Sequence, residues 1–212
     1  MMKKGILSFV ISIFFIGNVF TQVKKVNVVI FGDFEVVVKV GDGMFTVSST
    51  GEIIDVDMNG TVDYYGTSSF DTHAGKIRSI GGTSFDYYGI NSFDTHAGKI
   101  RSIGGISFDY YGITSSDTHT GKIHSIGGTL FDYYGKTSFD THKGKIRSIG
   151  GTSFDYYGIT SFDTHKGKIR SIGEMSFDYY GTSSPNTHAG KLKTVNRLVN
   201  SGEITFNLKV SY

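Results

Sequence analysis

The sequence repeats itself every 23 residues, and this periodicity constrains the fold more than any other feature of the chain. The pair Tyr-Tyr is followed by a glycine six times at that interval, at Gly66, Gly89, Gly112, Gly135, Gly158 and Gly181. Two motifs, Asp-Tyr-Tyr-Gly and Thr-His-x-Gly-Lys, are identical in all six copies. A fixed period of this length is typical of a repeat architecture, in which each unit packs against its neighbours.

Each unit contains two short segments of strand-forming composition joined by two glycines. In one copy the segments are Lys76–Ile80 and Thr83–Tyr88, and Gly81 and Gly82 lie between them. Consecutive glycines supply the positive φ values that a two-residue hairpin turn requires. We therefore predict an all-β fold of tandem 23-residue β-hairpins that forms an extended antiparallel meander, with a β-solenoid as the alternative.

A two-residue turn would place Ile80 opposite Thr83, and side chains would then alternate between the two faces of the sheet. The predicted faces are Arg78, Ile80, Phe85 and Tyr87 on one side, and Ile77, Ser79, Asp86 and Tyr88 on the other. Neither face is cleanly apolar, which is unusual for a sheet that packs on a core. The pattern therefore indicates either a thin sheet that is wet on both sides or a different register.

The repeats define the expected domain organisation. We expect a signal peptide over residues 1–21, an N-terminal β cap over 22–50, the repeat array over 51–192 and a C-terminal cap strand over 193–212. The array has six full units and a degenerate first hairpin, in which Asn59-Gly60 replaces Gly-Gly. The caps are expected because terminal repeats need partners that differ from those of internal repeats.

The N-terminus has the layout of a secretory signal peptide. Lys3 and Lys4 precede the apolar run 5–20, which is shorter than the roughly 20 residues of a membrane-spanning helix. We expect cleavage after Thr21, with a retained membrane anchor as the alternative, and no membrane span after cleavage. The predicted location is exported: periplasmic, outer-membrane-associated or extracellular.

Charge and cysteine content narrow the function classes. Cleavage would remove two lysines and no acid, which leaves 19 basic and 19 acidic residues and a formal net charge of zero. Nucleic-acid binding requires a basic field that displaces counterions from phosphates, so nucleic acid is not an expected partner. The chain has no cysteine, so a disulfide framework is excluded and stability must come from strand pairing and apolar burial.

The units resemble exported repeat proteins of flavobacteria and related Bacteroidota. This resemblance rests on Gly-Lys-Ile-Arg-Ser-Ile-Gly followed by Phe-Asp-Tyr-Tyr, and on the Lys-Lys leader that ends in Asn-Val-Phe-Thr-Gln. It implies a location but no activity. Looser likenesses exist to MORN-type hairpin repeats, through Tyr88 and Gly89, and to bacterial surface leucine-rich repeats of the BspA type, through Ser79-Ile80-Gly81 and Phe85.

The repeated Asp-Thr-His tripeptide is a candidate divalent-metal ladder. Its members are Asp71 with His73, Asp94 with His96, Asp117 with His119, Asp140 with His142, Asp163 with His165, and Asn186 with His188 in the last copy. Residues two apart on a strand share a face, but a metal site usually needs three or four ligands. Loop organisation through side-chain bonds to the backbone is the favoured interpretation, and no metal or cofactor is predicted.

The second tyrosine of each Tyr-Tyr pair is a candidate for surface binding. These residues are Tyr65, Tyr88, Tyr111, Tyr134, Tyr157 and Tyr180. Rows of tyrosine suit sugars or peptides because each ring offers contact area at low entropic cost. Cross-strand aromatic packing is the structural alternative, and it is favoured over binding.

The sequence predicts no catalytic residue. Ser, His and Asp recur in near-identical units, whereas an enzyme needs one differentiated cavity. We therefore expect a non-enzymatic structural or adhesive repeat protein that contacts a glycan or a cell-surface protein. The alternatives are a metal-binding array and a small outer-membrane barrel, the latter suggested by alternation from Ile204 to Tyr212 although the repeat segments are shorter than barrel strands of about 9–11 residues.

Overall fold

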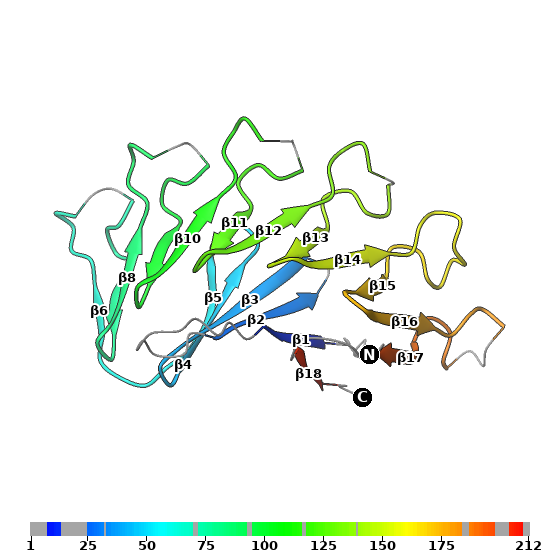
Figure 1. The fold of residues 1–212 in the computed structure, drawn as a ribbon. Coiled ribbons are helices and arrows are strands. Elements are labelled where there is room, and N and C mark those ends of the chain that lie inside the picture. The colour runs from blue at the N-terminus through cyan, green and yellow to red at the C-terminus, as the bar shows by residue number, and fades with distance from the viewer. Residues whose placement is uncertain are drawn as a thin grey trace. The chain divides into compact units, whose positions relative to one another are not determined.

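The computed structural model describes residues 8–13, 25–31, 33–69, 72–92, 95–115, 118–138, 140–183, 187–197 and 204–209 of the chain. Within these ranges every regular element is a β-strand, and no helix is long and apolar enough to cross a membrane. The strands form two sheets, one of six strands and one of twelve (Figure 1).

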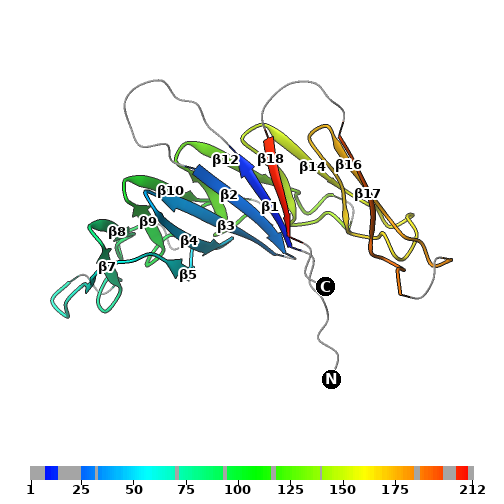
Figure 2. The same cartoon turned by 90° about the horizontal axis from the view of Figure 1, so that it is seen from below.

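The six-stranded sheet combines strands from both ends of the chain. Its strands are β1 (Ser8–Ile13), β2 (Lys25–Phe31), β3 (Asp33–Val40), β4 (Gly43–Ser48), β5 (Ile53–Asp57) and β18 (Ile204–Lys209). They lie in the order β18-β1-β2-β3-β4-β5, and each pairs antiparallel with its neighbours. Figure 2 shows β18, in red, beside the blue strands β1 and β2. The two predicted caps thus contribute to one sheet.

β1 lies inside the segment that we expect to be a signal peptide. In the whole chain it pairs with β18 on one side and with β2 on the other. The expected cleavage position after Thr21 lies outside the described residues. The domain boundaries, including this one, stay predictions.

The repeats form the twelve-stranded sheet. Its strands are β6 (Val62–Tyr64), β7 (Ile77–Ile80), β8 (Thr83–Tyr87), β9 (Ile100–Ile103), β10 (Ile106–Tyr110), β11 (Ile123–Ile126), β12 (Thr129–Tyr133), β13 (Ile146–Ile149), β14 (Thr152–Tyr156), β15 (Ile169–Ile172), β16 (Met175–Tyr179) and β17 (Leu192–Arg197). They follow one another in chain order from β6 to β17. The strand pairs with a described register are antiparallel, so the predicted meander is confirmed and the parallel rungs of a solenoid are absent from them.

The chain reverses at the double glycines, as the sequence predicts. Gly81 and Gly82 have φ values of 54° and 84°. Two successive positive φ angles match the twist of the strands that flank a tight hairpin. Ile80 lies opposite Thr83, and Ser79 lies opposite Ser84, which confirms the predicted register at the turn.

The predicted division of side chains between the two faces is wrong, because every second strand contains a β-bulge. Where β7 pairs with β6, the register shifts so that Ser79 faces Asp63 but Ile77 faces Tyr64. Arg78 is therefore an extra residue, and Ile77 comes to the same face as Ile80. The equivalent strand β9 buries both isoleucines of its Ile-Arg-Ser-Ile segment and exposes the arginine. One face of the sheet is consequently apolar and the other polar.

The degenerate first hairpin is not formed. The two strands expected to pair across Asn59-Gly60 lie in different sheets, since β5 pairs with β4 and β6 pairs with β7. Ile53 and Val56 on β5 occupy the positions of the two isoleucines that β9 buries, but both are only half-buried. Ile54 stands at the arginine position and is exposed. The segment thus lacks the burial that holds the equivalent strands to the array.

The chain divides into two compact units, one formed by Met1–Ile113, Gly121–Gly128 and Gly202–Tyr212, the other by Thr114–Thr120 and Thr129–Ser201. In the first unit the six-stranded sheet covers the apolar face of the repeats. The rings of Phe45 and Phe85 meet edge to face with centroids 5.1 Å apart, and the Ile123 N–H donates to the Ser49 carbonyl at 2.8 Å. In the second unit the repeats bury Ile149, Phe154, Ile172 and Phe177, among others.

Candidate functional site

The second tyrosine of each pair, expected as a binding row, is half-buried in all six repeats. Four of these tyrosines donate a hydroxyl hydrogen bond to a backbone carbonyl in the following repeat. The pairs are Tyr65 with Phe85, Tyr88 with Phe108, Tyr134 with Phe154 and Tyr157 with Phe177, at O···O distances between 2.8 and 3.0 Å. The row therefore links successive repeats, and only part of each ring is left for contact with a partner.

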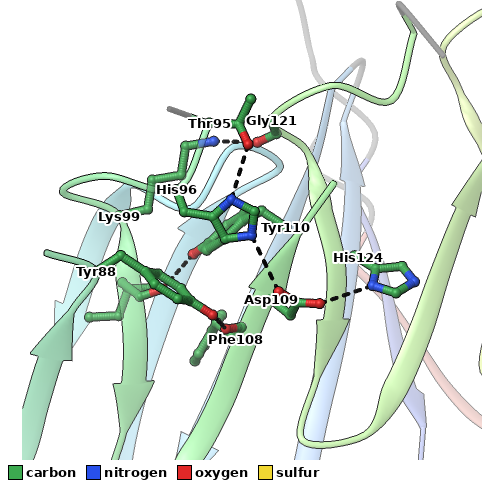
Figure 3. A network of polar contacts seen from close by, with 10 residues as sticks. Tyr88, Thr95, His96, Lys99, Phe108, Asp109, Tyr110, Gly121 and His124 are labelled. Atoms are coloured by element: carbon green, nitrogen blue, oxygen red, sulfur yellow. Dashed lines mark hydrogen bonds and ion pairs between the residues drawn. The ribbon is translucent and has the colours of Figure 1, made fainter. Parts of the chain in front are cut away.

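The histidine of each Thr-His pair is also turned toward the next repeat, as Figure 3 shows for His96. His96 Nδ1 lies 3.0 Å from the Thr95 hydroxyl, and its Nε2 lies 3.3 Å from Asp109 Oδ1. Because a hydroxyl can donate to Nδ1 whereas a carboxylate only accepts, this geometry assigns the proton of the neutral ring to Nε2. The same pair of contacts recurs at His73, His119, His142 and His165, and all five histidines are between 4% and 9% exposed.

Aromatic rings surround each buried histidine. His96 lies edge to face with Tyr88, at a centroid distance of 5.0 Å, and with Tyr110, at 5.6 Å. Tyr88 and Tyr110 also meet edge to face at 6.0 Å. Such edge-to-face pairs stabilise by about 0.5–1.5 kcal/mol beyond their area burial. The three rings pack one repeat against the next.

The invariant lysine makes two contacts with residues that follow it in the chain. The Lys99 ammonium lies 4.8 Å from the centroid of the Tyr110 ring and donates a hydrogen bond to the Gly121 carbonyl. Burial lowers the pKa of Lys99, and it raises the pKa of Tyr88. The equivalent lysines Lys76, Lys145 and Lys168 make the same two contacts.

In the five motifs from Asp86 to Asp178, the aspartate lies between the histidine of one repeat and a basic side chain on the neighbouring strand. Arg101 lies 3.4 Å from Asp86, and Arg147 lies 3.4 Å from Asp132. On β11 His124 replaces the arginine, and its Nδ1 lies 3.0 Å from Asp109 Oδ2 (Figure 3). Burial acts to raise the pKa of Asp109, but hydrogen bonds from His124, His96 and the Tyr110 N–H outweigh it and lower this pKa.

These contacts occupy the ring nitrogens of the buried histidines of the Asp-Thr-His tripeptides. Each buried histidine uses both ring nitrogens, and its carboxylate partner comes from the next repeat, 13 residues along the chain. Of the tripeptide acids, Asp140 and Asp163 are exposed, whereas Asp71, Asp94, Asp117 and Asn186 lie outside the described residues. No group of three or more potential ligands occurs among the residues described.

Among the described residues, four of the large apolar side chains that reach solvent lie in loops, and sequence reasoning missed them. Ile90, Ile113 and Ile159 follow directly after Tyr-Tyr-Gly, and these three with Phe162 are between 56% and 74% exposed. The sequence could have indicated these isoleucines, because they stand in polar loops, outside the strand segments of the repeat. Leu130 is exposed on β12, at a position that is serine in four other repeats.

Comparison with known proteins identifies the repeats. The family model described as the BspA type leucine rich repeat region matches six copies over residues 67–183, which is more than half of the chain. The predicted likeness to that family is therefore confirmed, and the resemblance to flavobacterial exported proteins stays a prediction. No curated protein and no solved structure matches the chain.

Proposed function

The chain belongs to the BspA-type leucine-rich repeat family, and we propose that it is a non-enzymatic, exported structural or adhesive protein that contacts a protein or glycan partner. Arrays of near-identical hairpins provide a long surface rather than one differentiated cavity. The invariant histidines, aspartates and lysines already serve contacts between repeats. Recognition is thus assigned to side chains other than these histidines, aspartates and lysines.

The observation that carries this proposal is the series of exposed loop isoleucines, Ile90, Ile113 and Ile159. In Figure 1 the loops after β8 and β10 leave the same end of their hairpins, as do those after β14 and β16. Exposed apolar side chains that recur at one position of the repeat are candidate contact points for another molecule. The half-buried tyrosine row from Tyr65 to Tyr180 is the second candidate element of this surface.

The contact surface is testable with matched variants. We would screen the purified protein on a glycan array and against a panel of extracellular-matrix and cell-surface proteins. The double variant Ile90→Ser and Ile113→Ser is expected to lose binding without losing stability, because both side chains are solvent-exposed. Leu130→Ser removes an equally exposed apolar side chain from the sheet face and is the control.

Three outcomes would contradict the contact surface. They are the absence of any binder, binding that is indifferent both to the loop variant and to Tyr180→Ala, and equal loss of binding in the Leu130→Ser control. Loss of binding with Tyr180→Ala alone would move the site from the loops to the tyrosine row.

Export is the part of the proposal that rests on the N-terminus. The basic residues Lys3 and Lys4, followed by the apolar run 5–20, support cleavage by a signal peptidase. Intact-mass measurement of the protein from its native host is expected to show a chain that begins at Gln22. Cleavage there would remove β1 from between β18 and β2, and a mass that includes Met1 would exclude it.

A further inference from the structure

Successive repeats are joined by one set of donors and one set of acceptors. At one such contact the donors are Tyr88, His96 and Lys99, which precede β9, and the acceptors are the Phe108 carbonyl, the Asp109 carboxylate and the Tyr110 ring on β10 (Figure 3). Every donor group precedes its acceptor in the chain. The contact therefore has a direction, and an array of such repeats must end in unused donors at one end and unused acceptors at the other.

The C-terminal end of the array carries the unused donors. Tyr180, His188 and Lys191 occupy the positions of Tyr88, His96 and Lys99. His188 is exposed, although its five counterparts are buried, and its ring is tilted 49° from that of Tyr180 rather than perpendicular. Within the described residues the His188 side chain contacts the Thr187 hydroxyl and the Tyr180 ring, and no carboxylate lies against it.

The N-terminal end carries the unused acceptors. Val62, Asp63 and Tyr64 on β6 occupy the positions of Phe85, Asp86 and Tyr87 on β8. Tyr64 is 57% exposed, whereas Tyr87, which lies under the Lys76 ammonium, is 6% exposed. Asp63 pairs with Arg78 at 3.5 Å, and no histidine contacts it among the residues that the structure describes.

The backbone edges at the two ends are also complementary. β6 and β17 are the outermost strands of the twelve-stranded sheet. β17 corresponds to a first hairpin strand such as β7, and β6 corresponds to a second hairpin strand such as β8. The open edge of β17 therefore lacks a second hairpin strand, which β6 is, and the open edge of β6 lacks a first hairpin strand, which β17 is. Unpaired edges are ready templates for pairing with another chain.

We propose that copies of this chain associate head to tail, with β17 of one copy pairing antiparallel with β6 of a second copy. His188 Nε2 would then donate to Asp63, the Tyr180 hydroxyl to the Val62 carbonyl, and the Lys191 ammonium would lie over the Tyr64 ring. The interface repeats the contact that already joins neighbouring repeats. It is heterologous, so each added copy presents a new end and growth leads to a ring or a filament rather than a two-fold dimer.

Sedimentation velocity of the full chain over a range of concentrations tests this proposal. We expect oligomers whose size grows with concentration. Asp63→Lys removes the acceptor of His188 and brings an ammonium toward Lys191, and His188→Glu brings a second carboxylate toward Asp63. Each single variant is expected to weaken association about tenfold or more, because juxtaposed like charges oppose docking. Asp42→Lys makes the same charge change in an exposed turn of the other sheet and is the control.

Mixing the two single variants is the decisive step. In a mixture of Asp63→Lys and His188→Glu, the introduced lysine of one variant meets the introduced glutamate of the other. The opposite ends of the same two copies keep the native Asp63 and the native His188, so association is expected to return. Thermal melting of each variant confirms that it is folded. The proposal is overturned by a monomer at every concentration, by association that neither variant weakens, by equal weakening in Asp42→Lys, or by a mixture that stays dissociated.

Discussion

The Tyr88 hydroxyl provides a direct measure of how strongly one repeat holds the next. It donates to the Phe108 carbonyl at 2.8 Å, across the boundary between the second and third repeats. Tyr88→Phe removes this donor and keeps the ring, so the edge-to-face contacts with His96 and Tyr110 are preserved. The substitution therefore isolates one hydrogen bond.

The expected loss of unfolding free energy is about 1 kcal/mol, the typical net contribution of one hydrogen bond between uncharged groups. For a chain of this length, that loss corresponds to a fall in Tm of about 2–4 °C. Tyr180→Phe is the matched control. Its hydroxyl has no protein acceptor in the part of the chain that the structure describes, so the expected change is close to zero.

Equilibrium unfolding in urea measures both variants, at a concentration where the protein is monomeric. The midpoint of Tyr88→Phe should fall while the m-value stays unchanged, since the surface exposed on unfolding is the same. Equal midpoints for Tyr88→Phe and Tyr180→Phe would refute the assignment of a stabilising role to this contact. A changed m-value would show instead that the repeats no longer unfold together.

Three further predictions follow from particular positions. Gly104→Ala should destabilise the protein more than Gly128→Ala in urea unfolding. Both glycines have positive φ, but a Cβ at Gly104 would lie 2.5 Å from Val40, whereas a Cβ at Gly128 would meet open space. Equal losses of unfolding free energy would contradict the contact with Val40. Burial raises the pKa of Tyr87 from 10.0 to about 12, so its neutral form stabilises the fold below pH 10 and this contribution is lost as pH rises through about 12. A spectrophotometric titration should therefore show tyrosines that ionise near pH 10 only after unfolding, and normal titration of every tyrosine in the folded protein would exclude this. Calorimetric titration with Zn²⁺ or Ca²⁺ should give no heat and no shift in Tm, since the buried histidines use both ring nitrogens; a saturable signal would restore the metal-binding alternative.

The sequence determined the local geometry of the repeats. Two adjacent glycines fix a reversal of the chain because positive φ is sterically easy only without a Cβ, and this depends on no other part of the protein. The period, the strand positions and the opposition of Ile80 to Thr83 follow from it. The two invariant motifs also marked the residues that matter for contact between repeats, although not which residue contacts which.

Only the tertiary structure decided the partners. Alternation assumes a regular strand, so the extra residue at Arg78 reversed the predicted face of Ile77. His96 contacts Asp109, 13 residues further along the chain, a partner that the tripeptide pattern did not indicate. β5 likewise pairs with β4 and not with β6, its expected hairpin partner. Turn conformation is a property of a few consecutive residues, whereas burial and pairing depend on segments that the sequence separates, and only folding brings those together.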